Sequence, residues 1–461
     1  MTAPLYDNFS NAAKVEKTDM SMTEPTSKEK SAPNVGFILL YFGILTLLIH
    51  LASPNGSLID IVTTYMLKNQ LHTSAADISL FRFLVAIPIY IAFFFGLARD
   101  LWSPFGMRDR GYFLLFAALS ACTFVLMARF QLSSSMLFIG LITLMIFARF
   151  IHAAYQGLMA LLSQENTMSG RIAVLWIIIS YIPEITGSWG SGYLVENISP
   201  AQTFMSMALI MSLLAVMACW KPRAIFSHAY DQPLAHRANF LVDVKRLARH
   251  KAIYPAVLIM FMFQVSPGSS TPLQFHLSNS LHLSDSYYGY YNAIFAASFI
   301  PTLLLYGYLC TRIKMVKLLW LSMIITVPQM IPLAFINSAD SALWMAVPSG
   351  LLGGLAAAAV YDLAMRSCPP GLQGSFMMLV AGGNLLATRG GDILGTYIYG
   401  LDPVNGFFYC VMTTTLVYAL ILPVIAFIPK EIIATADGES NPVLAAQILA
   451  EIDADRIPAT A

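Results

Sequence analysis

The chain has 461 residues, of which 57% are hydrophobic and 11% are charged, and its formal net charge is +1. Soluble domains carry about 25% charged residues, so this composition excludes an ordinary water-soluble protein and predicts a chain embedded largely in lipid. The five cysteines have no paired spacing, so neither a disulfide framework nor a zinc site is expected.

The chain opens with a polar stretch at 1–35 that lacks the apolar core and cleavage site of a signal peptide. We expect this stretch to be a disordered cytoplasmic tail.

Apolar segments long enough to cross a hydrocarbon layer of about 30 Å follow in two sets of six. The first set is predicted at 36–67, 77–98, 111–131, 136–161, 170–194 and 201–220, and the second at 252–280, 286–311, 316–337, 341–366, 372–399 and 404–429. We therefore expect an N-terminal six-helix bundle at 36–220, a cytoplasmic central loop at 221–251, a C-terminal six-helix bundle at 252–429 and a cytoplasmic tail at 430–461. In that tail, Asn441-Pro442 predicts the start of a short surface helix.

The first span contains Ser53-Pro54-Asn55-Gly56. Proline and glycine together predict a break in the helix, whose freed backbone groups must face a cavity. The alternative is that the helix ends near Ala52. We favour the break because the stretch from Leu58 to Met66 is apolar and would otherwise be a stray segment.

The chain repeats itself. The run Leu67-Lys-Asn-Gln-Leu-His-Thr-Ser74 recurs 210 positions later as Leu277-Ser-Asn-Ser-Leu-His-Leu-Ser284, and Gly170 and Gly187 recur as Gly374 and Gly391. Both echoes run in the same chain direction. They predict an all-α membrane protein of twelve transmembrane helices in two parallel-repeat six-helix halves.

The loop after the second span holds a glycine–acid–glycine–basic pattern formed by Gly96, Asp100, Gly106, Arg108 and Arg110. It resembles the cytoplasmic loop motif of the major facilitator superfamily. We expect a conformational latch, in which the acid accepts hydrogen bonds from helix N-terminal amides and from arginines. The alternative is an ordinary basic inner loop. The equivalent loop of the second half, 307–317, has no aspartate.

A second resemblance lies in the tenth and eleventh spans. The stretch from Tyr361 to Gly374, followed by Ala381-Gly-Gly-Asn384 and Gly390-Gly-Asp-Ile-Leu-Gly395, resembles the folate–biopterin transporter family, a branch of the same superfamily. Gln373 stands where that family usually has an acid. The resemblance implies a secondary transporter with folate- or pterin-like compounds as the first cargo to test.

Lysine and arginine are distributed unevenly between the two sets of loops. With the N-terminus inside, the outer loops hold only Lys68 and Arg129, and the remaining loop cations lie in the inner loops. This asymmetry predicts that both termini are cytoplasmic, in a multi-pass protein of the plasma membrane.

Polar side chains within the spans are the candidates for function, because a charge at mid-bilayer costs at least about 2.5–3.5 kcal/mol. The candidates for contact with substrate or protons are Asp60, Arg149, His152, Gln156, Glu184, Gln264, Asn384, Arg389 and Asp392. Glu184 and Arg389 lie at similar depths on pseudo-equivalent helices. We expect Glu184 to carry a proton and Arg389 to bind an anionic group.

Structural alternatives stay open for several of these residues. Arg389 has a possible local partner in Asp392, and Arg149 can bond to backbone carbonyls. His152 can be a packed hydrogen-bonding residue, and Glu184 can be purely structural. Asp60 and Arg82 are expected to pair as an outer gate or strut, and Asp362 and Arg366, four apart, as a structural ion pair.

These features together predict a secondary transporter of a small organic solute. No phosphate-binding glycine–lysine loop, nucleophile–base arrangement or metal-ligand cluster is found in the sequence, so we expect no enzyme activity, no cofactor and no metal. The expected partners are a small-molecule substrate, protons and the lipid bilayer, without nucleic acid, and the chain is expected to be a monomer. The alternatives are a non-transporting assembly factor of the same fold and a broad-specificity exporter.

Overall fold

The computed structural model describes residues 35–73, 75–222, 225–226, 240–283, 285–402 and 404–439. The described residues from Gly36 onward form one compact unit. The expected N-terminal tail up to residue 34, most of the central loop and the expected helix start at Asn441-Pro442 lie outside the described residues. Secondary structure in the described part is helical throughout.

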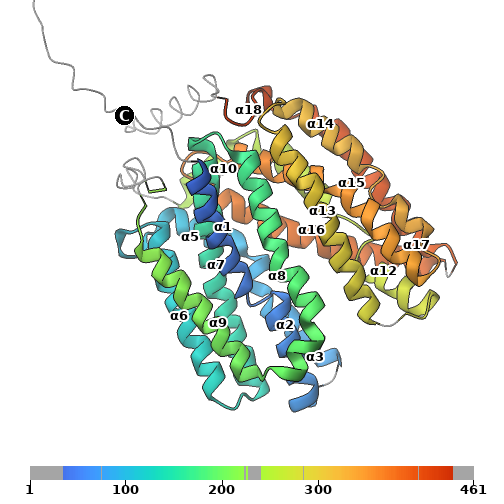
Figure 1. The fold of residues 1–461 in the computed structure, drawn as a ribbon. Coiled ribbons are helices and arrows are strands. Elements are labelled where there is room, and N and C mark those ends of the chain that lie inside the picture. Colours follow the sequence, from blue (N-terminus) through green and yellow to red (C-terminus); the bar gives the residue numbers. More distant parts are fainter. Residues whose placement is uncertain are drawn as a thin grey trace, which may run out of the picture. The chain divides into compact units, whose positions relative to one another are not determined.

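The first half of the described chain contains the helices drawn from blue to green in Figure 1. They are α1 (Val35–Leu51), α2 (Ser57–Tyr65), α3 (Ala75–Val85), α4 (Ile87–Tyr90), α5 (Ala92–Leu101), α6 (Asp109–Arg129), α7 (Ser134–Glu165), α8 (Ser169–Asn197) and α9 (Pro200–Cys219). Helix α6 packs along α7 and α9, and α2 packs against α8.

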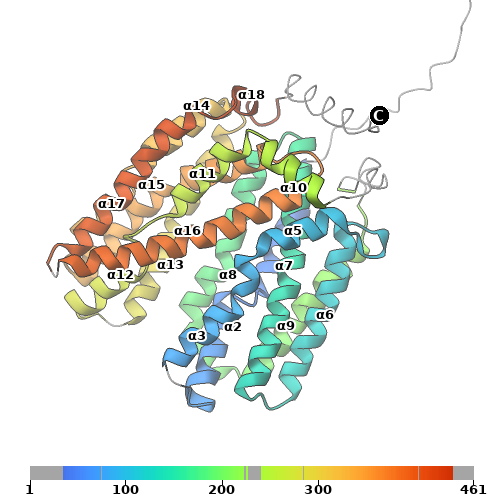
Figure 2. The ribbon, with the colours of Figure 1, turned by 180° about the vertical axis from the view of Figure 1, so that it is seen from behind.

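The second half begins after a short connecting helix, α10 (Phe240–Arg249), and is seen best from behind in Figure 2. Its helices are α11 (Ile253–Gln264), α12 (Thr271–Phe275), α13 (Asp285–Leu309), α14 (Met315–Thr326), α15 (Ala339–Arg366), α16 (Gln373–Leu401) and α17 (Gly406–Ile425), with the short α18 (Lys430–Ile433) after them. Helix α13 packs along α15, and α11 packs against both α16 and α17.

The first span of each half is broken at the same place. Helix α1 stops at Leu51 and α2 resumes at Ser57, so the break expected from the Pro54–Gly56 sequence is present. In the second half α11 stops at Gln264 and α12 resumes at Thr271. The two halves therefore share an interrupted helix that leaves backbone groups free of the helical ladder.

The sequence echo is also an echo in structure. Residues Met66–Gln70 and His276–Ser280 each form a wide, π-type turn. Two residues after each turn comes a histidine with a left-handed backbone, His72 at φ 49° and His282 at φ 54°. Matching the two turns at a spacing of 210 residues shows that the halves repeat one architecture.

Eight helices in the described part are long and apolar enough to cross a membrane as single segments. The first and seventh predicted spans are not among them because they are broken, and the second is divided into α3, α4 and α5. The eleventh, α16, is long enough but carries several glycines and polar side chains. Helix interruptions and polar content therefore explain why eight of the twelve predicted spans qualify as single apolar helices in the described part.

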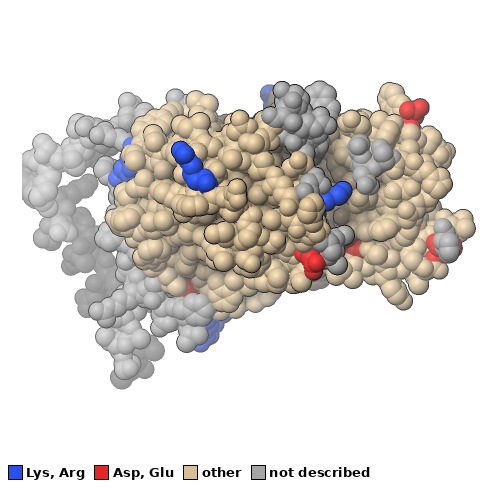
Figure 3. All heavy atoms as spheres, turned by 90° about the horizontal axis from the view of Figure 1, so that it is seen from below, with Lys and Arg blue, Asp and Glu red and all other residues tan. Residues whose placement is uncertain are grey.

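The two halves meet chiefly at one end of the bundle. This end, called the latch end below, carries loops 102–108, 166–168, 310–314 and 367–372 and lies at the top of Figure 1. There the Gln164 amide donates to the backbone carbonyls of Met365 and Cys368, at 2.9 Å each. The opposite, far end carries loops 71–73, 130–133 and 336–338, and its described surface is largely uncharged (Figure 3).

Candidate transport site and latch

Asp100, the last acid of α5, bonds to the start of α16 in the other half. Its Oδ1 accepts from the backbone N–H of Gly374 at 3.2 Å, and its Oδ2 accepts from the N–H and the hydroxyl of Ser375 at 2.7 and 2.6 Å. The first amides of a helix have no partner inside the helix and carry partial positive charge. A buried carboxylate on one half therefore caps a helix of the other half.

Arg99 holds this carboxylate in place. Its Nη1 donates to Asp100 at 2.8 Å, while Nε and Nη2 form a two-pronged pair with Asp109 at 2.6 Å each. Such bidentate pairs are stronger and more directional than neutral hydrogen bonds. Asp100 is thus fixed between an arginine of its own loop and the amides of the opposite half.

Two glycines permit this close approach. A Cβ on Gly96 would stand 2.5 Å from the carbonyl oxygen of Gly374, and a Cβ on Gly157 would stand 2.7 Å from Cζ of Arg99. Both distances lie below any ordinary contact. The glycines let α5 lie against α16 and let the guanidinium lie flat on α7.

The other residues of the expected latch take different positions. Gly106 has φ +67°, the left-handed conformation that glycine adopts without strain. Arg110 donates to the carbonyls of Ala218 and Cys219 at 3.0 and 2.9 Å, at the end of α9. Arg108 donates its backbone N–H to the Ser103 hydroxyl at 2.7 Å. Arg110 therefore anchors the loop within its own half.

The Asp100 carboxyl is fully enclosed at the latch end. Burial raises the pKa of Asp100 above its ordinary value, and the charge of Arg99 and the bonds from Ser375 act in the opposite direction. A buried carboxylate without such partners would take up a proton. The bonds from the opposite half therefore favour the charged carboxylate only while that half is docked.

Glu184 lies beside the break in the first span. A hollow of about 460 Å³, counted with its open side, is lined by His50, Leu51, Ser53, Asn55, Gly56, Leu58, Ser180, Pro183 and Glu184. The hollow therefore joins the interrupted backbone of the first span to the carboxylate of α8. Among the described residues Glu184 forms no ion pair, with Arg389 or with any other cation.

Aromatic rings link the hollow to the second half. The His50 ring lies 5.7 Å from the His152 ring and 6.3 Å from the Trp176 ring. Trp176 in turn lies 4.3 Å from the ring of Tyr361 on α15, whose hydroxyl accepts from the Asn384 amide at 3.3 Å. We call these five residues the central cluster; they come from α1, α7, α8, α15 and α16, and so from both halves.

Several polar atoms in and near the central cluster have no hydrogen-bond partner among the described residues. They are Nε of Arg149, Oε1 of Gln156, Nε1 of Trp176 and Oδ1 of Asn384. Arg149, His152 and Gln156 are all buried on α7, and the Arg149 charge acts on both His50 and His152. Leaving a buried polar group unpaired costs about 1–3 kcal/mol, so a polar ligand that paired with these atoms would gain that free energy.

The second-half candidates are arranged differently. Both carboxylate oxygens of Asp392 accept from Thr271, Oδ1 from its N–H and Oδ2 from its hydroxyl, at 2.9 Å each. Asp392 thereby caps α12 after the break in the seventh span. Arg389 is exposed and forms no ion pair with Asp392 in the described structure, and Gln264 is half-buried at the end of α11.

Two predicted ion pairs are present. Arg82 donates to Asp60 at 2.6 Å and to the Thr64 hydroxyl at 2.7 Å. Arg366 donates to Asp362 at 2.7 Å, and Tyr306 donates to the same carboxylate at 2.9 Å. Asp60 is thus tied to Arg82 in the arrangement expected of a strut.

Sequence reasoning missed some members of both sites. His50 and Trp176 gave no signal, because a single aromatic residue in an apolar span is ordinary core, and Tyr361 was noted only as the start of a family-like stretch. Arg99 and Asp109 lie within the stretch of the expected motif, between Gly96 and Arg110, but their opposite charges were not predicted to pair. Searching the described residues finds no group of side chains suited to a metal ion.

Comparison with known proteins identifies the family of this fold. Residues 44–388 match the family model of the Major Facilitator Superfamily. A crystal structure of the Major Facilitator Superfamily transporter FucP in the outward conformation superposes with a TM-score of 0.61 at 16% identity, covering 86% of this chain and 99% of that one.

Curated relatives are similar over most of their length. The chain is 22% identical over 402 residues to Folate transporter 2 of Plasmodium falciparum (isolate 3D7), covering 83% of this chain and 85% of that protein. It is 23% identical over 403 residues to the Folate-biopterin transporter of Synechocystis sp. (strain ATCC 27184 / PCC 6803 / Kazusa), covering 83% and 81%. The family match, the twofold repeat and the helical architecture agree: the chain is a multi-pass integral membrane protein that belongs to the Major Facilitator Superfamily.

Proposed function

We propose that this protein is a proton-coupled secondary transporter that moves a small organic anion through the central cluster by alternating access. The observation that carries the proposal is that the cluster is built from both halves and holds buried polar atoms without partners. A site shared by two halves changes whenever one half rocks against the other, which alternating access requires.

Arg149 is the group we assign to the anionic part of the cargo. It is buried, its Nε has no partner in the described structure, and it lies on the same helix face as Gln156. A guanidinium offers several donors in a planar fork that fits a carboxylate. The rings of Trp176 and Tyr361, tilted by 59° to each other, offer aromatic faces against which a planar cargo can pack.

Glu184 is the group we assign to the proton. It lies on the hollow at the broken first span, within reach of water through the open side. Protonation would remove its charge and change its affinity for the neighbouring free backbone groups, so that the carboxyl could couple proton entry to the movement of α1 and α2.

The names of the curated relatives suggest the cargo to test first. Those proteins are named as folate and folate–biopterin transporters, and folate combines a flat ring system with carboxylates. This chemistry suits a site with one guanidinium, two histidines and two large aromatic rings.

The decisive experiment is uptake into liposomes that contain the purified full-length protein. Folate, biopterin and a neutral molecule of similar size would each be offered under three conditions. These are an inwardly directed proton gradient (acidic outside), no gradient, and a gradient collapsed by a proton ionophore. We expect accumulation of an anionic cargo only with the gradient, and none in protein-free liposomes. Equal uptake under all three conditions would exclude proton coupling, and no uptake of any compound would exclude these cargoes.

A further inference from the structure

The sequence repeat predicts a second contact between the halves at the latch end, equivalent to the one that Asp100 makes. In the first half, Asp100 accepts from the backbone amides of Gly374 and Ser375. The repeat spacing of 204 residues pairs these two positions with Gly170 and Arg171, at the start of α8. A symmetric latch therefore requires a carboxylate at the amides of Gly170 and Arg171.

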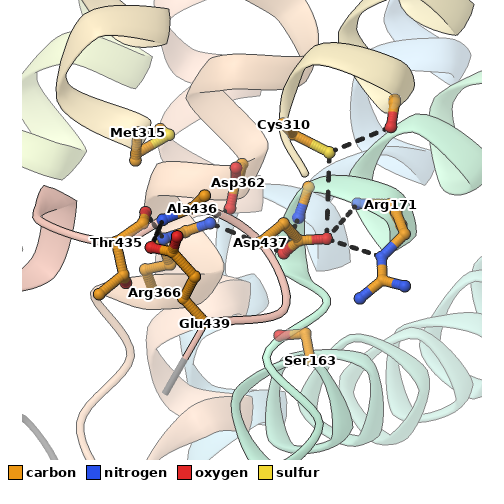
Figure 4. A network of polar contacts seen from close by, with 12 residues as sticks. Ser163, Arg171, Cys310, Met315, Asp362, Arg366, Thr435, Ala436, Asp437 and Glu439 are labelled. Carbon is orange, nitrogen blue, oxygen red and sulfur yellow. Dashed lines mark hydrogen bonds and ion pairs between the residues drawn. The ribbon is translucent and has the colours of Figure 1, made fainter. Parts of the chain in front are cut away.

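That carboxylate is present, and it belongs to Asp437. Its Oδ1 accepts from the N–H of Gly170 at 3.2 Å, and its Oδ2 accepts from the N–H of Arg171 at 3.4 Å. Figure 4 shows the Asp437 side chain pointing at Arg171 from the segment that follows α18. The two helix starts that echo each other in sequence are thus each capped by a buried aspartate.

The loop of the second half cannot supply this acid itself. At the repeat spacing of 210 residues the position of Asp100 corresponds to Cys310. The Cys310 sulfur lies 3.9 Å from Oδ2 of Asp437, and its carbonyl accepts from the Asp437 N–H at 2.8 Å. Asp437 therefore places its carboxylate beside the residue that replaces the missing aspartate.

Asp437 bonds to arginines of both halves. Nε of Arg171 in α8 donates to Oδ2 at 2.8 Å, and Nη2 of Arg366 in α15 lies 3.6 Å from Oδ1. The same Arg366 also pairs with Asp362 at 2.7 Å. Burial and the Asp362 charge raise the pKa of Asp437, which the two arginines oppose.

The backbone around Asp437 fastens the segment to both halves. Thr435 accepts from the Met315 N–H at 3.3 Å and from Nη1 of Arg366 at 3.0 Å, on the second half. Gly438 donates to the carbonyl of Thr167 at 2.6 Å, on the first half. Residues Thr435–Glu439, which we call the C-terminal strap, therefore cross the junction between the halves at the latch end.

We propose that Asp437 is the second latch acid, which holds the α8 start against the second half and must release it whenever this end opens. The inference rests on the proposed alternating access, because a latch has a role only in a protein that opens here. Asp437 is a positioning residue, since it acts by setting which conformation the halves adopt.

The test uses the chain's own thiols as reporters of opening. Cys310 is buried beside Asp437, and Cys410 is buried on α17 in contact with Gly395. The full-length protein, without cargo, is treated with a water-soluble maleimide, and peptide mass spectrometry follows each cysteine. For Asp437→Asn we expect Cys310 to react about tenfold faster or more, the effect of losing one charge-assisted bond on a two-state equilibrium, while Cys410 stays at the wild-type rate.

Matched variants make the result decisive. Asp402→Asn removes another acid that accepts from backbone amides, those of Val404 and Asn405, and should leave Cys310 unchanged. If Asp437→Asn also exposes Cys410, the fold is disturbed, and the Cys310 rate is then measured in Arg171→Gln, which leaves the strap and the α8 amides intact. Faster labelling of Cys310 alone in that variant would support the proposal. A wild-type Cys310 rate in both Asp437→Asn and Arg171→Gln would overturn the proposal. Since the labelling assay uses no cargo, its result stays interpretable even if the proposed transport activity is not found.

Discussion

Glu184 and Arg149 are the two ionisable side chains on which the proposed mechanism depends. Glu184 lines the hollow at the broken first span, whereas Arg149 is buried on α7 with Nε unpartnered among the described residues. A charge kept within the membrane without a fixed partner is costly. We therefore assign the proton to Glu184 and the anionic group of the cargo to Arg149.

Replacing Glu184 by Gln should uncouple transport from the proton gradient. The amide keeps the size of the side chain but cannot bind and release a proton, so uptake should lose its dependence on external pH. The measurement is initial uptake rate against pH in liposomes. The control is Glu165→Gln, an exposed acid at the end of α7. A wild-type pH profile in Glu184→Gln would rule out the coupling role.

Replacing Arg149 by Gln should raise the KM for an anionic cargo about tenfold or more, because a hydrogen bond to a charged group contributes about 1.5–3 kcal/mol. Neutral cargo should change much less. Arg389→Gln is the comparison, since Arg389 is exposed on α16. If Arg389→Gln alone discriminates against anions, the cargo's charge is read on α16 rather than on α7.

At the scale of elements, glycine determines how closely helices approach, both between the two halves and within the second half. Helix α5 reaches α16 at Gly96, and α16 reaches the break of the seventh span at Gly391 and Gly395, where an added Cβ would stand 2.9 and 2.1 Å from backbone atoms. Small residues at such crossings let backbones meet and let helices move past one another. The glycine positions therefore mark the close helix contacts, of which the α5–α16 contact at Gly96 joins the two halves.

The variant Gly96→Ala should open the latch end. Its Cβ would stand 2.5 Å from a backbone oxygen that cannot move aside independently, and such overpacking costs about 1–3 kcal/mol. We expect a lower melting temperature and faster maleimide labelling of Cys368. Gly383→Ala is the control on α16, because nothing lies within 4 Å of its added Cβ. Identical behaviour of the two variants would contradict the close-packing explanation.

At the scale of the whole molecule, the halves meet at the latch end through Asp100 on one side and Asp437 on the other. The two contacts are related by the repeat, yet one acid lies at the end of α5 and the other in the C-terminal strap. Asp100 belongs to the first repeated half, whereas Asp437 lies after the last described helix of the second half and so outside the repeat.

The orientation of the whole molecule is a further prediction. Basic loops favour the cytoplasm, so the latch end should face inward. In a background with Cys122 and Cys219 replaced by Ser, a cysteine at Lys68 should react with an impermeant reagent in intact cells. A cysteine at Arg312 should react only after permeabilisation. Both positions are exposed, so the reverse pattern would invert the topology.

The sequence alone determined the class of this protein. Its composition required lipid, its echoes required two similar halves, and Pro54 with Gly56 required the break between α1 and α2. The ion pair of Asp362 and Arg366 also followed from a four-residue spacing. These features are local or periodic, so they can be recognised from short windows of sequence.

Only the tertiary structure decided which distant residues meet. Asp437 bonds to Gly170 across 267 positions, and the tilted rings of Trp176 and Tyr361 meet between halves that no spacing rule connects. Such contacts depend on how whole helices cross and which side chains they bury together. The proposed transport site and the second latch acid are products of that packing, and for this reason the sequence indicated their chemistry without showing their location.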